Sequence, residues 1–292
     1  MAKQSFVSLI NNNKIMRLLK VSSSLNQIFR LVLKVTNLDK NSGFISTWVN
    51  SCKMNLDMSE PIQRSMYKGL YEPIQTNWFK QILKMGDCVV DLGANFGYYT
   101  TLSSKLIGNE GIVFAFEPSL RACSSLYQTI QSNNLVNVEL YCYAVGDMNG
   151  LVELQVPPAN FESHSPSILT QPYQNKYWKS TLVPLVSLDS FFKKNIKLKK
   201  IKLIKIDVEG FEPNVLRGLK DLASKGMIEN IICEFNSGWL EKNNSSHDEL
   251  LELFLSLGFV VKDKTSLLSF YEKKIDKVCT LQDFYFQYKS LS

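Results

Sequence analysis

A short apolar strand that runs into a glycine-spaced loop constrains the fold of this chain more than any other stretch. Residues 88–92 form an apolar run interrupted by Asp91. Gly93 and Gly97 follow, and a helical pattern begins at Tyr98. Glycine turns sharply and lets a ligand approach bare backbone, and N–H groups at a helix start are available to a polar or anionic group. The stretch therefore predicts a strand, a tight loop and a helix that hold a small molecule.

The residue that ends the next apolar run indicates which molecule is held. Residues 111–116 lead into Glu117, and an acid at this place accepts hydrogen bonds from both hydroxyls of a ribose. A dinucleotide fingerprint that starts at Gly93 needs glycines where this chain has Asn95 and Tyr98. The geometry for a pyrophosphate is therefore missing, and the loop fits S-adenosylmethionine better than NAD.

Several separated motifs resemble the FkbM family of S-adenosylmethionine-dependent methyltransferases. The matching stretches are residues 91–100, 117–118 and 204–212, together with Tyr71-Glu72-Pro73 and Ser187-Leu188-Asp189-Ser190. The resemblance covers residues 66–236 and implies an α/β, Rossmann-like class I methyltransferase. Such a fold has a mostly parallel seven-stranded sheet with an antiparallel last strand.

The strand ends of this implied fold supply the cofactor-binding candidates. Ala144 is included because it ends a strand expected at residues 138–144. Glu72 either lies near the cofactor mouth or is an ordinary acid at a helix start. The candidates are Asp91, Gly93, Ala94, Asn95, Gly97, Glu117 and Ala144.

Acids that follow a second strand are candidates for the chemistry. In the implied fold the strand at 201–206 lies beside the strand at 88–92, so the turn that begins at Asp207 faces the Gly93 loop. Asp207 is the first candidate to take a hydroxyl proton or to orient the methionine end of the cofactor, and Glu209 is the second. The alternative is that both acids hold the turn. Lys205 either neutralises them or points elsewhere.

A metal ion and a loop histidine are further alternatives at this site. Asp207, Glu209 and Glu234 would offer oxygen ligands to Mg²⁺, but three acids on neighbouring strand ends are weak evidence, and we expect no metal. His164 lies in the long polar segment 157–179. It is a candidate general base brought in by closure of a lid, or else a solvated loop residue.

The positive charge of the chain is concentrated at its N-terminus. The lysines and arginines of residues 1–40 account for the whole net charge of +6, so the remainder is neutral and poorly suited to nucleic acid. We expect a basic amphipathic helical extension over residues 1–65 and a methyltransferase domain over 66–292. The basic helix either contacts an anionic membrane surface or a partner, or packs on the domain with its basic face in water.

The cysteines bear on the compartment. Six are scattered without C-x-x-C or zinc-ligand spacing, so we expect buried, reduced thiols and a cytoplasmic protein. No apolar run of bilayer length and no signal-peptide pattern is found, which leaves a peripheral membrane contact through the basic extension.

The resemblance also implies the reaction. It favours methyl transfer to a hydroxyl oxygen of a small molecule or glycan, most plausibly a saccharide or a glycosylated metabolite. Two alternatives stay open. One is an S-adenosylmethionine-binding partner protein without activity, and the other is an NAD-linked oxidoreductase, which the absent third glycine disfavours.

Overall fold

The computed structural model describes residues 43–158, 166–169, 178–193, 200–262 and 281–289. They divide into one compact unit that ends at Tyr71 and another that begins at Glu72, whereas the sequence placed a boundary after residue 65. The basic helix expected within residues 1–40 lies outside the described residues. Within the described residues, no helix has the length and apolar character required to cross a membrane.

The first unit contains a β-hairpin and a short helix. Strand β1 (Phe44–Val49) pairs antiparallel with β2 (Cys52–Asp57), and helix α4 (Pro61–Tyr67) follows. Every second residue of β2, beginning with Cys52, is buried, as the alternation of side chains along a strand requires.

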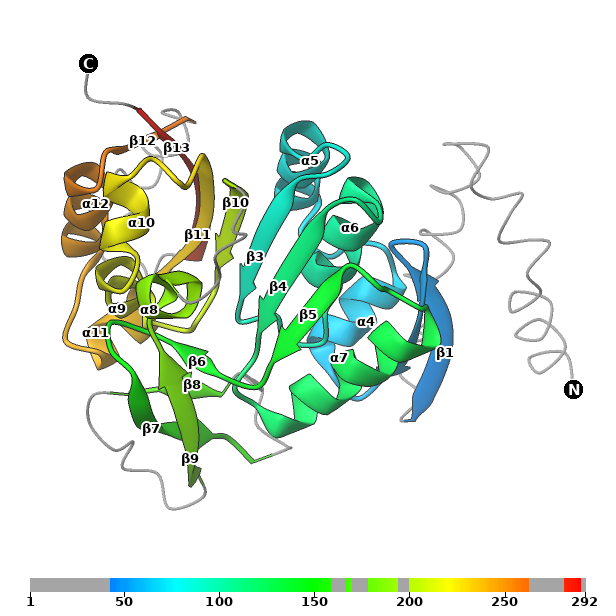
Figure 1. Cartoon of the computed structure of the whole chain (residues 1–292). Helices are drawn as coiled ribbons and strands as arrows, with labels where there is room; N and C mark the ends of the chain where they lie inside the picture. Colours follow the sequence, from blue (N-terminus) through cyan, green and yellow to red (C-terminus); the bar gives the residue numbers. More distant parts are fainter. Residues whose placement is uncertain (1–42, 159–165, 170–177, 194–199, 263–280, 290–292) are drawn as a thin grey trace, which may run out of the picture. The chain divides into compact units, whose positions relative to one another are not determined.

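A seven-stranded sheet forms the second unit's centre (Figure 1). Its strand order is β12-β13-β11-β10-β3-β4-β5, and β13 runs antiparallel to both of its neighbours. The predicted sheet with an antiparallel last strand is therefore confirmed. The bounds are β3 Cys88–Leu92, β4 Ile112–Phe116, β5 Val138–Tyr141, β10 Ile201–Ile206, β11 Asn230–Asn236, β12 Phe259–Val261 and β13 Leu281–Tyr288.

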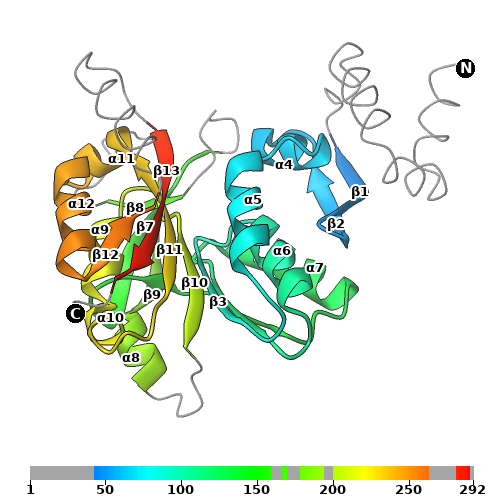
Figure 2. The same cartoon turned by 90° about the horizontal axis from the view of Figure 1, so that it is seen from above.

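The central strands are buried and mostly apolar because helices cover both faces of the sheet. In the view from above, α5, α6 and α7 lie on one side of β3, and α8 and α12 lie on the other side of the sheet (Figure 2). Helix α6 begins after Gly97, whose φ is +89°, and ends before Gly108, as the sequence predicted. The helices are α5 Pro73–Ile82, α6 Tyr98–Ile107, α7 Leu120–Ser132, α8 Leu188–Lys193, α9 Glu212–Arg217, α10 Lys220–Ser224, α11 Ser237–Lys242 and α12 His247–Ser256.

A second, four-stranded sheet is inserted between β5 and β10 in the sequence. Its order is β6-β9-β7-β8, and β7 pairs antiparallel with β8 and β9. The bounds are β6 Ala144–Val145, β7 Gly150–Val156, β8 Ser167–Ile168 and β9 Lys179–Val186. No sequence pattern predicted this separate sheet.

Ala144 belongs to this second sheet, not to the end of a strand at 138–144. Strand β5 ends at Tyr141, and Ala144 pairs with Leu185 of β9. Its buried side chain packs in an apolar cluster with Leu154 and Phe211. The expected strand was too long because two short strands of different sheets follow one another along the chain.

Stacked aromatic rings join α12 to the last strand, and their removal tests the core. The rings of Phe254 and Phe286 stack with centroids 3.7 Å apart, and both are fully buried. We expect Phe254→Ala to lower the free energy of unfolding by about 3–5 kcal/mol, because it leaves a cavity. Leu255→Ala, at the adjacent position with 53% exposure, should change it by less than about 0.5 kcal/mol. Urea unfolding of both variants measures the difference. Equal losses in the free energy of unfolding would contradict the assignment of Phe254 to the core.

Candidate functional site

The backbone of Asp207 lies directly against the Gly93 loop. A Cβ atom at Gly93 would lie 1.8 Å from the carbonyl oxygen of Asp207, and the φ of Gly93 is +76°. The Asp207 N–H also donates to the carbonyl of Leu92 at 3.1 Å. The expected contact between loop and acidic turn is present, and its tightness explains why glycine occupies this position. A side chain would collide with protein backbone before it reached any ligand.

The N–H groups of the loop bond mainly within the protein. Those of Gly93 and Ala94 both donate to the carbonyl of Phe116 at 3.0 Å, and that of Gly97 donates to Ala94 at 2.9 Å. The Asn95 N–H donates to Oε2 of Glu117 at 2.8 Å. These four N–H groups are therefore bonded within the protein, whereas the sequence suggested that they are available to a ligand. Those of Gly93, Ala94 and Asn95 fasten the loop to the end of β4 and to Glu117, and that of Gly97 closes a turn within the loop.

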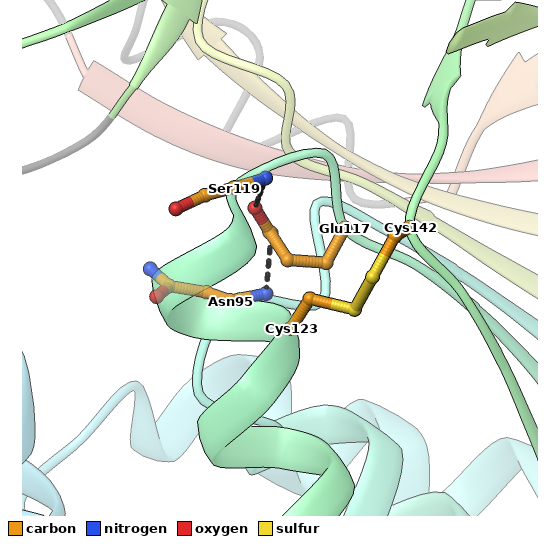
Figure 3. Close-up of a disulfide and its surroundings, with 5 residues drawn as sticks. All are labelled: Asn95, Glu117, Ser119, Cys123 and Cys142. Atoms are coloured by element: carbon orange, nitrogen blue, oxygen red, sulfur yellow. Dashed lines mark hydrogen bonds between the residues drawn. A yellow bond between two sulfur atoms is a disulfide. The ribbon is translucent and has the colours of Figure 1, made fainter. Parts of the chain in front are cut away.

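The carboxylate of Glu117 is held by backbone on both sides (Figure 3). The Ser119 N–H donates to Oε1 at 2.8 Å, opposite the Asn95 bond to Oε2. Each carboxylate oxygen has two lone pairs, so each retains an acceptor position for a hydroxyl donor. The side chain is 6% exposed. Burial raises the pKa of Glu117 to about 7, although both N–H groups oppose the shift.

Asp91 ties the same loop to helix α6. Its Oδ2 accepts a hydrogen bond from the hydroxyl of Thr100 at 2.5 Å, and both residues are buried. Burial raises the pKa of Asp91 to about 6, against the effect of the Thr100 hydrogen bond. The strand, loop and helix predicted from residues 88–100 are thus joined by a side-chain contact that the sequence pattern did not reveal.

Two of the six cysteines form a disulfide. Cys123 in α7 bonds to Cys142, which follows β5, so the expectation of reduced thiols is wrong for this pair. Cys52, Cys88 and Cys233 are buried thiols, and Cys279 lies outside the described residues. The inference of a cytoplasmic location from reduced cysteines loses its basis.

A buried ammonium lies beneath the acidic turn. Lys205 is 1% exposed, and its Nζ lies 3.4 Å from Oδ2 of Asp207 and 2.9 Å from Oδ1 of Asp283 in β13. Gln75 of α5 donates to the other oxygen of Asp283 at 2.5 Å. Lys205 therefore points at the candidate acid, which settles the two alternatives that the sequence left for it. Asp283 carries no motif, and its part in this site could not be foreseen.

Glu72 belongs to the same charged group. It accepts a hydrogen bond from the hydroxyl of Tyr99, and the ring of Tyr99 lies 5.7 Å from the Lys205 ammonium. Burial raises the pKa of Glu72, Lys205 lowers it, and repulsion from Asp207 adds to the rise. These contacts favour the alternative in which Glu72 lies near the candidate site over that of an ordinary acid at a helix start.

Three acids meet at the open side of the turn. Oxygen atoms of Asp207, Glu209 and Glu234 lie within 4.8 Å of one another. Burial raises the pKa of Glu234, and repulsion from Asp207 and Glu209 adds to the effect. Carboxylates at this spacing can ligate a divalent cation, but acids also gather without one, so the absence of a metal stays a prediction.

The turn is supported by residues from two other segments, α9 and β8. Glu212 accepts hydrogen bonds from the N–H groups of Val208 and Gly210 at 3.2 and 3.1 Å. The hydroxyl of Ser167 in β8 donates to the carbonyl of Glu209 at 2.8 Å, and the φ of Glu209 is +53°. The long polar segment thus borders the candidate site at β8. His164 lies outside the described residues.

Replacement of Lys205 tests how much its buried ammonium contributes to the stability of the fold. We expect Lys205→Met to lower the free energy of unfolding by about 3–5 kcal/mol, because Asp207 and Asp283 lose their shared counter-ion. Lys202→Met on the same strand removes an ion pair with Glu229 at 26% exposure and should cost about 1 kcal/mol or less. Denaturant titrations of the two variants compare them. Equal losses would show that the burial of the first ion pair has no energetic consequence.

A family model and a curated relative match parts of this chain. A family model described as "Methyltransferase FkbM domain" matches residues 91–261. A curated relative, Methyltransferase 1 of Beauveria bassiana, is 28% identical over 159 residues, which are 50% of this chain and 63% of that protein. The matched part therefore spans less than two thirds of this relative.

Solved structures are similar at low identity. An O-methyltransferase from Bacillus cereus in complex with SAH is 13% identical with a TM-score of 0.39, over 74% of this chain and 80% of that one. A SAM-dependent O-methyltransferase from Thermotoga maritima is 11% identical with a TM-score of 0.42, over 86% and 79%. The family match, which spans more than half of the 292 residues, shows that the chain belongs to the FkbM methyltransferase family.

Proposed function

We propose that this chain transfers a methyl group from S-adenosylmethionine to a hydroxyl oxygen of a saccharide or glycosylated metabolite. Membership of the FkbM methyltransferase family supports the reaction class. The observation that supports the site most strongly is the contact between Gly93 and the backbone of Asp207, because it fixes a candidate base beside the cofactor loop. The hydroxyl acceptor and its sugar come from the motif resemblance alone.

The described residues fit the cofactor at its ribose. Glu117 presents a carboxylate with an open acceptor position on each oxygen, at the end of β4, where a ribose diol is expected. The loop from Asp91 to Gly97 would lie along the methionine part. When bound, S-adenosylmethionine supplies an electrophilic methyl group on a sulfonium.

In this proposal, Asp207 takes up the proton that the acceptor loses. Its carboxylate is 23% exposed and is held from below by the Lys205 ammonium at 3.4 Å. Burial raises the pKa of Asp207, Lys205 lowers it, and repulsion from Asp283 adds to the rise. A carboxylate of raised pKa is a better proton acceptor near neutral pH. In transfer to a hydroxyl, the proton lost from oxygen would pass to this carboxylate.

Calorimetric titration separates this proposal from its rivals. S-adenosylhomocysteine should bind to the full-length protein and NAD should not. Binding of NAD alone would favour the oxidoreductase. Binding of S-adenosylhomocysteine without donor consumption over a panel of sugar, amine and nucleic acid acceptors would favour an inactive binding protein.

The pH dependence of cofactor binding tests Glu117. Its pKa is raised to about 7, so the carboxylate takes up a proton as the pH falls through this value and loses acceptor capacity. We expect the affinity for S-adenosylhomocysteine to fall by roughly fivefold to tenfold between about pH 8 and about pH 6. Glu117→Gln should bind weakly with little dependence on pH.

The control for this titration is an exposed acid outside the loop. Glu153 in β7 is hydrogen-bonded to Ser180, and Glu153→Gln should keep the wild-type affinity and slope. If the affinity of Glu117→Gln still depended on pH as in the wild type, the titrating group would be another residue.

Asp207→Asn separates a base from a structural acid. The amide keeps the shape and can still accept from Lys205, but it cannot take a proton. Methyl transfer in a single turnover should fall by about 10²- to 10⁴-fold, with a small change in melting temperature. The exposed acid Asp221 in α10 provides the control, because Asp221→Asn should alter neither quantity. Near-normal transfer by folded Asp207→Asn would remove this residue from the mechanism.

A further inference from the structure

The disulfide between Cys123 and Cys142 lies beside the carboxylate that would read the ribose (Figure 3). Cys123 lies in the first turn of α7, and Cys142 follows directly on the last residue of β5. The crosslink therefore joins the helix that begins after the Glu117 turn to the strand that lies beside β4. The role argued below rests on the proposed function, because it treats Glu117 as part of the cofactor site.

Hydrogen bonds connect both ends of the disulfide to Glu117. On one side, the Cys123 N–H donates to the carbonyl of Ser119 at 2.8 Å, and the Ser119 N–H donates to Oε1 of Glu117 at 2.8 Å. On the other side, the Glu117 N–H donates to the carbonyl of Tyr141 at 3.0 Å, and Tyr141 is bonded covalently to Cys142. The S–S bond closes a ring that contains both the backbone and the carboxylate of Glu117.

When the S–S bond is broken, the part of the ring that holds the Glu117 carboxylate is less constrained. Without the S–S bond, the start of α7 is tied to the end of β5 by non-covalent contacts alone. The Ser119 N–H then has more freedom to move relative to the Glu117 backbone, which stays on the sheet. A carboxylate that must be ordered on binding holds a diol less tightly than one that is already in place.

We propose that the Cys123–Cys142 disulfide is a positioning crosslink of the cofactor site, and that the affinity for the cofactor depends on whether the pair is oxidised. The two sulfurs differ in access, since Cys123 is 4% exposed and Cys142 is half-buried. A thiolate of a dithiol reductant attacks Cys142, the S–S bond breaks, and Cys123 leaves as a thiolate and takes up a proton. The second thiol of the reductant then displaces Cys142 as a thiol, and the reductant becomes the disulfide.

Coupling of this kind is reciprocal. If reduction weakens binding by a given factor, binding must make the disulfide harder to reduce by the same factor. We expect the dissociation constant for S-adenosylhomocysteine to rise about tenfold on reduction, within the usual range of coupling between sites. A tenfold factor corresponds to a midpoint potential about 30 mV more negative at saturating S-adenosylhomocysteine. A disulfide that merely stabilises the fold would show no such shift.

The experiment uses the full-length protein in both redox states. Calorimetry measures S-adenosylhomocysteine binding to air-oxidised protein and to protein reduced with dithiothreitol, and alkylation with mass spectrometry identifies the cysteines that open. The midpoint potential is then measured in dithiothreitol buffers with and without S-adenosylhomocysteine. The double variant Cys123→Ala/Cys142→Ala should bind S-adenosylhomocysteine with the affinity of the reduced protein, and dithiothreitol should not change this affinity. Cys52→Ala, which changes a buried cysteine outside the pair, should behave as wild type.

The outcomes separate this inference from the proposed function. Oxidised protein that fails to bind S-adenosylhomocysteine contradicts the proposed function itself. Equal affinities in the two states, or a potential that does not respond to S-adenosylhomocysteine, overturn the positioning role while leaving the function intact. Air-oxidised protein that retains both thiols, or reduced protein that is unfolded at the assay temperature by circular dichroism, overturns it as well. If the double variant does not fold, the reduced wild type decides.

Discussion

Gly93 has no side chain, and the carbonyl oxygen of Asp207 occupies the place that a Cβ atom would take. This contact brings the ends of β3 and β10 together at the point where the chain leaves both strands. Any larger residue would separate the loop from the turn, because the colliding atom belongs to the backbone and cannot rotate away. The position of the candidate base relative to the candidate cofactor site therefore depends on one missing methyl group.

Much of the main sheet could be predicted because its signals are local. The strand at 88–92 is apolar except for Asp91, the strand at 201–206 leads into Asp207, and the helix at 98–107 is bounded by glycines on both sides. The second sheet gave no comparable signal, since β6 and β8 have two residues each and acquire meaning only from their partners. Ala144 was misplaced for this reason. Strands of two residues that pair with distant segments are too short to show the alternation of apolar and polar residues by which a strand is predicted.

The candidate site divides in the same way. The approach of Asp207 to the Gly93 loop followed from the motifs and the fold that they imply. The partners that set the charge of the site followed only in part. Glu72 belongs to a matching motif and was expected either near the cofactor mouth or at a helix start, whereas Asp283 comes from a distant segment without a pattern of its own. The disulfide was missed because Cys123 and Cys142 have no diagnostic spacing and meet only when α7 begins over the end of β5.

The inserted sheet occupies the crossover by which the chain passes from the edge strand β5 to the centre of the main sheet at β10. Its strand β8 touches the carbonyl of Glu209, while the loop at Gly93 is fastened to β4 by bonds in which the insert takes no part. Changes of length or sequence in the insert can therefore alter what approaches the acidic turn without disturbing the carboxylate of Glu117. The two parts of the candidate site are thus held by different segments of the chain, so the sequence around one part can change without moving the other.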